Sequence, residues 1–180
     1  MVASWAKFEM VALGLAMEGK RLFYQYAVGL GFLATIRDDG GPRLHPICPI
    51  LAADGLYAFI VPSPKRADLR RDGRYALHCY PPEESDDEFC VMGRATEVDD
   101  PAVRAQVEAA YHHPVQERWT LFAFDVERCL PLSTATAETG RRHTQNGSTR
   151  VSERDSADLS EPWRQGGLYP TIERFIHPSA

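Results

Sequence analysis

Residues 31–69 read GFLATIRDDGGPRLHPICPILAADGLYAFIVPSPKRADL, and this stretch decides the fold. It holds three runs rich in apolar, aromatic and β-branched residues, at 31–37, 43–51 and 56–61. The turn sequences DDGG at 38–41 and DG at 54–55 separate these runs. Short strands at intervals of about ten residues are typical of a β-sandwich or a β-barrel, so the stretch predicts a β-meander.

The second of these predicted strands is unusual because it carries Pro46 and Pro49. Proline has no backbone N–H and cannot donate a hydrogen bond to a neighbouring strand. We therefore expect this strand to lie at a sheet edge, at a bulge or against a ligand.

Further strands are predicted at 75–80, 89–98 and 121–126, which makes six in all. Gly93, inside the fifth, indicates a bulge or a close approach of two backbones. Helices are predicted within 4–28, with Ser4 as N-cap, and after Asp100, which caps a helix that begins at Pro101. A short helical turn is predicted at 67–72.

The composition restricts the possible partners. The net charge is −5 and the pI is about 5.7, so the chain lacks the basic excess that binding to nucleic acid requires. The apolar run at 10–17 is bracketed by Glu9 and Glu18 and is too short for a membrane span or a signal peptide. The four cysteines are widely spaced, which favours reduced thiols. We expect a cytoplasmic protein that binds neither a membrane nor nucleic acid.

One cluster of polar residues comes from the second strand and from the turn after the third: Arg43, His45, Ser63, Lys65 and Arg66. Backbone N–H groups at a turn entering a helix, with basic side chains beside them, favour binding of one phosphate group. The alternative is a solvated basic face, in which Lys65, Arg66, Arg70 and Arg71 are balanced by Asp68 and Asp72. Spacing alone leaves both interpretations open.

The remaining histidines and nucleophiles give little indication of catalysis. A single strand histidine such as His45 is more often structural or exposed than functional. His112 and His113 are more readily explained as a helix end than as metal ligands, and we expect no metal site. No serine or cysteine lies in a motif that implies an activating base, so no catalytic residue is identified.

Residues 32–47 resemble the opening hairpin of the pyridoxamine 5′-phosphate oxidase-like, FMN-binding split-barrel family. Residues 63–77, in which a lysine begins a turn and a leucine packs inward, resemble the next block of that family. Residues 89–99, with Gly93 followed by Arg94 and Ala95, are similar to a later strand and its acidic exit. The resemblance covers about residues 5–130, and the order and spacing of the motifs make it specific.

The resemblance implies a mainly β fold, a six-stranded antiparallel split β-barrel with flanking helices, in a homodimer with cofactor clefts at the subunit interface. Lys65 matches the lysine that holds the FMN phosphate, and Ser63 and Arg66 flank it. The strand that runs beside the isoalloxazine and ribityl chain is matched by Arg43, His45, Pro46 and Ile47. Val61 would end the adjoining strand.

The function implied is that of an oxidoreductase, in which FMN, or alternatively the deazaflavin F420, transfers hydride to an unknown small-molecule substrate. The chain lacks the C-terminal substrate segment of pyridoxamine phosphate oxidases proper, which argues against that reaction. The alternative function is a non-catalytic flavin- or heme-binding sensor, for which His45 would be the residue of interest.

Three regions are expected. Residues 1–30 form a helical segment packed on the barrel, and residues 31–132 form the cofactor-binding split barrel. Residues 133–180 comprise a polar segment, 133–161, and a tail whose aromatic part, 163–175, docks on the barrel or at the dimer interface.

Overall fold

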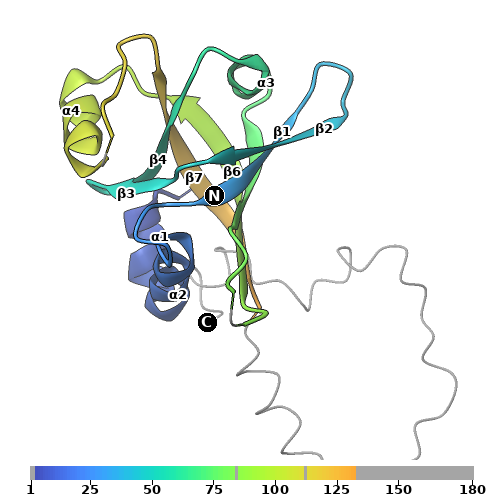
Figure 1. Cartoon of the computed structure of the whole chain (residues 1–180), viewed down its shortest axis with the longest axis vertical. Helices are drawn as coiled ribbons and strands as arrows, with labels where there is room; N and C mark the ends of the chain where they lie inside the picture. The colour runs from blue at the N-terminus through green and yellow to red at the C-terminus, as the bar shows by residue number, and fades with distance from the viewer. Residues whose placement is uncertain (1–2, 84, 112, 133–180) are drawn as a thin grey trace, which may run out of the picture.

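The computed structural model describes residues 3–83, 85–111 and 113–132 (Figure 1). They form one antiparallel sheet with four helices. The strands are β1 (Gly31–Ile36), β2 (Pro42–Ile47), β3 (Ile50–Ala52), β4 (Gly55–Ile60), β5 (Arg74–Cys79), β6 (Glu88–Glu97) and β7 (Thr120–Leu132). The helices are α1 (Trp5–Val11), α2 (Leu13–Phe23), α3 (Pro64–Arg71) and α4 (Pro101–Ala110). The predicted tail at 133–180 lies outside the described residues.

The strand order is β2-β1-β5-β6-β7-β4-β3, and the sheet curls on itself (Figure 1). Its first and last strands, β2 and β3, follow each other in the sequence and are separated only by Cys48 and Pro49. The two edges of the curled sheet are therefore joined by a single run of chain. This arrangement is the six-stranded barrel predicted from the sequence, with one strand divided between both edges.

The predicted strand at 43–51 is thus two strands rather than one. β2 pairs with β1, from Pro42 opposite Ile36 to Ile47 opposite Gly31, and β3 pairs with β4. The predicted pairing of this run with the strand at 56–61 is correct only for β3, since β4 otherwise pairs with β7. Pro49 has no N–H to donate, and the chain changes ladders at this point.

The core lies inside the curl of the sheet and between the sheet and the N-terminal helices. Burial alternates along β1, β4 and β5, as expected for strands with one face inward. Below the sheet in Figure 1, α1 and α2 bring Trp5 and Phe23 against Phe89 of β6, and Phe8 packs on Trp5. The Phe23 and Phe89 rings meet edge to face at 5.6 Å. Ala3 adds a bridge to Val126 of β7.

Several local predictions are confirmed. The Ser4 side chain accepts from the Lys7 N–H at 3.5 Å, and Asp100 accepts from Ala102 N–H at 2.8 Å. A register shift lies between Met92 and Gly93, and a Cβ at Gly93 would stand 2.0 Å from the Asp125 carbonyl oxygen. Gly93 therefore serves both a bulge and a close backbone approach.

All four cysteines are free thiols, and Cys79 and Cys129 are buried in the core. In the described part of the chain, every helix is too short or too polar to cross a membrane.

Candidate functional site

The candidate site lies where α3 meets β2. α3 starts immediately after β4, because Ser63 adopts extended backbone angles (φ −166°, ψ 163°) and Pro64 is preset for the first helical turn. Gly73, with φ of +73°, turns the chain from the end of α3 into β5. These features hold α3 at the same end of the sheet as the β1–β2 hairpin (Figure 1).

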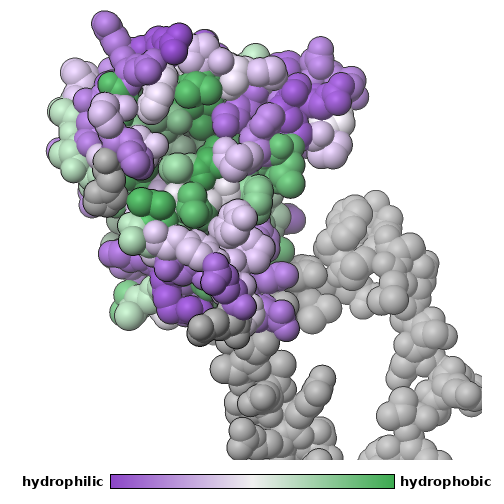
Figure 2. All heavy atoms as spheres, in the orientation of Figure 1, coloured by the Kyte–Doolittle hydropathy of each residue, from purple (hydrophilic) through white to green (hydrophobic). Residues whose placement is uncertain are grey.

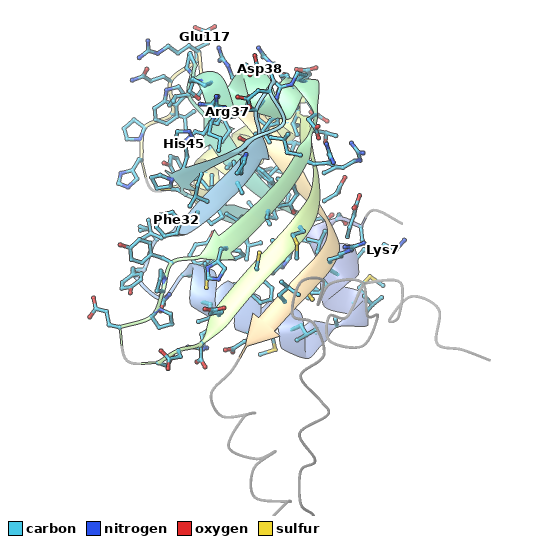
Figure 3. All side chains as sticks on the ribbon, turned by 90° about the vertical axis from the view of Figure 1, so that its right-hand side faces the viewer. Lys7, Phe32, Arg37, Asp38, His45 and Glu117 are labelled. Carbon is cyan, nitrogen blue, oxygen red and sulfur yellow. The ribbon has the colours of Figure 1, made fainter. Side chains whose placement is uncertain are left out.

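β2 presents alternate side chains to the two sides of the sheet. Arg43, His45 and Ile47 share the more buried side, whereas Leu44 and Pro46 are exposed. Leu33 of β1 lies opposite His45. In Figure 3, His45 lies below Arg37 and above Phe32, the residues near the two ends of β1. Ile47 is buried in the core cluster rather than open to a ligand.

Lys65 reaches from the first turn of α3 to β2. Its Nζ donates to the carbonyl oxygen of Pro46 at 3.3 Å, and no carboxylate of the described residues forms an ion pair with it. The side chain is half-buried, and burial lowers the pKa of its amine. A partly desolvated cation that bonds only a neutral carbonyl retains the capacity to bind an anion.

His45 lies next to that carbonyl and holds an unpaired nitrogen. Its Nε2 is shielded from solvent and has no hydrogen-bond partner, the single such side-chain atom within the described ranges. Leaving a buried polar group unpaired costs about 1–3 kcal/mol. Burial, then Lys65 and then Arg43 lower the pKa of His45, while Asp68 opposes them. The imidazole is therefore neutral at pH 7.

Arg43 is held by Asp68, a residue whose role sequence reasoning missed. Asp68 is 3 % exposed, and its Oδ2 accepts from Arg43 Nε at 2.6 Å and from Thr35 Oγ1 at 3.0 Å. Its Oδ1 accepts from Arg71 at 3.3 Å. Burial raises the pKa of the Asp68 carboxyl, but the hydrogen bonds from Arg43, Thr35 and Arg71 outweigh it and hold the pKa below its usual value. Asp68 thus fixes β1, β2 and α3 together.

The other predicted residues do not converge on this point. The Ser63 hydroxyl donates back to the Val61 carbonyl at 2.8 Å, and Val61 lies exposed one residue beyond β4. Arg66 Nη1 donates to the Arg118 carbonyl at 3.2 Å, at the approach to β7. The structure therefore brings together Arg43, His45, Pro46 and Lys65, while Ser63 and Arg66 are engaged elsewhere.

A small hollow lies beside the link between β2 and β3, where sequence reasoning expected no feature. Tyr24, Cys48, Pro49, Tyr111 and His113 contribute to its walls. Tyr24 OH accepts from the Leu51 N–H at 2.9 Å, which fixes the start of β3. Burial, followed by the nearby Cys48, raises the pKa of Tyr111 to about 12. The described residues hold no group of three or more His, Cys, Asp or Glu side chains that could bind a metal ion.

No protein-family model matches the sequence, and no curated protein matches it. Solved structures do share its architecture. HupZ of group A Streptococcus is 16 % identical, with a TM-score of 0.55, over 66 % of this chain and 94 % of its own. A Clostridium acetobutylicum protein related to general stress protein 26, of the pyridoxinephosphate oxidase family, is 14 % identical, with a TM-score of 0.52, over 66 % of this chain and 87 % of its own. This chain has the pyridoxamine 5′-phosphate oxidase-like split-barrel fold.

The same split barrel occurs in a heme binding protein from Mycobacterium smegmatis, 17 % identical with a TM-score of 0.52 over 63 % of this chain. This chain spans about half, 52 %, of that protein's length. At these identities the likeness concerns the fold, and the function must be argued from the site.

Proposed function

We propose that this split barrel binds FMN, with F420 as the alternative, where α3 meets β2, and that it is an oxidoreductase acting on a small molecule. The observation that carries the proposal is the environment of the Lys65 amine. Its amine is half-buried, bonds only the Pro46 carbonyl and has no carboxylate partner in the described part of the chain. A phosphate monoester supplies the charge and the acceptor oxygens that this amine lacks.

The residues beside Lys65 fit the rest of such a ligand. Pro46 is exposed on β2 and has no N–H, so a flat ring lying on it would cover no unpaired donor. Arg43 is held in place by Asp68, which keeps its positive charge next to His45. The Ser63 hydroxyl does not cap α3, which leaves the first-turn N–H groups without a side-chain acceptor. Bound FMN would supply the hydride chemistry, while these residues bind and orient it.

A homodimer belongs to the same proposal. Figure 2 shows apolar residues gathered across the middle of one face, between more polar regions. Leu44 of β2 is 64 % exposed and Tyr80, just after β5, is 42 % exposed, although both are large apolar side chains. Exposed apolar surface of this kind favours a contact with a second copy of the chain. The four free thiols support the cytoplasm, a reducing compartment, as its location.

The test is a titration of the purified protein with FMN, in which quenching of the flavin fluorescence measures binding. We expect binding at micromolar FMN and a loss of at least about tenfold in affinity for Lys65→Met, because one charge-assisted hydrogen bond is removed. Arg70→Met is the matched control, since Arg70 lies on the same helix but is paired with Glu97. Absence of binding of both FMN and F420 to the wild-type protein would refute the proposal.

The second candidate function is heme binding without turnover. The observation that favours it is the neutral imidazole of His45, whose Nε2 is unpaired and could ligate iron. The fold is shared with a mycobacterial heme binding protein. A Soret band in the protein mixed with hemin, absent in His45→Ala, would establish this function, and an unchanged hemin spectrum would exclude it.

A further inference from the structure

Two observations at the α3–β2 contact have no explanation in the packing of the protein. The first is the unpaired, shielded Nε2 of His45. The second is the gathering of cations around it: Arg43 lies two residues away on the same side of β2, and Lys65 bonds the carbonyl of the next residue. The carboxylate that acts on His45, that of Asp68, is already bonded to Arg43, so an anionic ligand is the partner that this unpaired nitrogen beside two cations would accept.

The residues that surround Lys65 in space differ from those that flank it in the sequence. Ser63 and Arg66, which flank Lys65 in the chain, are bonded to the Val61 and Arg118 carbonyls. Lys65 of α3 and Arg43 of β2 are instead the two cations that act on His45. The partners of Lys65 in holding an anion are therefore across the contact, on β2.

We propose that His45 completes an anion cradle with Lys65 and Arg43, and that on binding a phosphorylated ligand its imidazole takes a proton from solvent and donates through Nε2 to a phosphoryl oxygen. The inference rests on the proposed binding of FMN and names the group that selects its phosphate. Because Nε2 is shielded from solvent, the groups that cover it must move as the ligand enters.

Proton uptake follows from the charges facing His45. Lys65 from α3 and Arg43 from β2 disfavour the imidazolium, and Asp68 from α3 favours it only in part. The pKa of His45 is therefore lowered in the ligand-free protein. A phosphate dianion offsets both cations and accepts the Nε2 hydrogen bond, so it raises that pKa in the complex. Binding of FMN must then weaken as pH rises through the pKa of the complex.

The experiment is calorimetric titration of the full chain with FMN, at about pH 7 and about pH 8.5, above the second phosphate pKa of about 6. Each titration is run in two buffers of different ionisation enthalpy, which gives the number of protons taken up. We expect the wild-type protein to take up a proton and to lose affinity by up to about tenfold for each pH unit. Riboflavin, which lacks the phosphate, should bind without proton uptake.

His45→Gln is the decisive variant, because its amide can hydrogen-bond near the position of Nε2 but does not titrate. We expect it to bind FMN with no proton uptake and a flat pH profile, whereas Arg70→Met keeps the wild-type profile. Proton uptake that persists in His45→Gln would overturn the inference and leave the proposed function standing. FMN binding by the wild-type protein without proton uptake would overturn it with no variant needed. Failure of the wild-type protein to bind FMN at either pH would remove the proposed function and this inference together.

Discussion

The two ends of α3 use their basic side chains in different ways. At the C-terminal end, Arg70 donates through Nε and Nη2 to the Glu97 carboxylate, each at 2.7 Å, and Arg71 donates to Asp68. At the N-terminal end, Lys65 crosses to β2 and bonds only the Pro46 carbonyl. A basic helix that looks uniform in sequence is therefore charge-balanced at one end and unbalanced at the other. The solvated-face interpretation describes Arg70, and Lys65 is the residue that departs from it.

Among the residues of α3, Asp68 lies between the two ends, and its substitution is expected to have the largest effect on stability. Asp68→Asn should lower the free energy of unfolding by about 2–3 kcal/mol, because Arg43 and Arg71 lose a buried carboxylate. Urea denaturation measures the change. Asp72→Asn is the comparison, since Asp72 lies on the same helix end but its partner Arg74 is exposed, so its loss should cost clearly less than the loss of Asp68. Equal effects of the two substitutions would contradict the structural role of Asp68.

The acid limb of the stability curve should depend on the same residue. The pKa of Asp68 is lower in the folded protein than the usual value of 3.8, so the unfolded chain binds the proton more readily. Its contribution to stability is complete above about pH 4 and is lost as pH falls further. Urea denaturation over the acid range should show a shallower loss for Asp68→Asn than for the wild-type protein. Parallel curves would mean that Asp68 titrates as an ordinary carboxyl.

A smaller effect of opposite direction is expected at Lys65. Burial lowers the pKa of this amine below 10.5, so at alkaline pH the unfolded chain binds more protons than the folded protein. The free energy of unfolding should therefore rise as pH increases toward 10.5, and Lys65→Met should remove that rise. At neutral pH this variant should be at least as stable as the wild-type protein. A clear loss of stability at neutral pH would show that Lys65 is a structural cation.

The smallest effect is expected at the balanced end of the helix. Arg70→Met removes an exposed pair with Glu97 and should change the thermal midpoint only slightly, less still at high salt. It should also leave FMN binding unaltered. If Arg70→Met weakened FMN binding as much as Lys65→Met, the contrast between the two ends of α3 would be lost.

Most of the barrel could be predicted from the sequence because its signals are local. Alternating apolar residues and Gly-containing turns mark the strands, and Asp100 with Pro101 marks the start of α4. The division of β2 from β3 could not be predicted in this way. Pro46 and Pro49 indicated an irregular strand, but the change of ladder depends on the curl of the whole sheet, which no local pattern encodes.

The candidate site was predictable only in part, for a related reason. Lys65 and β2 were identified together through the family resemblance, and the structure places them in contact. Asp68 was considered only within the solvated-face alternative, because an acid among basic residues has the composition of a surface. Neighbouring residues of a helix point in different directions, so the inward packing of Leu69 gave no indication that Asp68 is buried as well. The unpaired state of His45 Nε2 depends on what surrounds it in space and had no sequence signal.

The continuous run from β2 to β3 also affects how the protein behaves among other chains. Exposed sheet edges offer unpaired N–H and C=O groups to foreign strands and invite aggregation. Here β2 and β3 form the two edges of the sheet, and the prolines of β2, Pro42 and Pro46, each lack an N–H. The β2 margin therefore offers fewer donors to a foreign strand. The β3 margin, Ile50–Ala52, carries no proline, but it is only three residues long, which limits the pairing that it can offer.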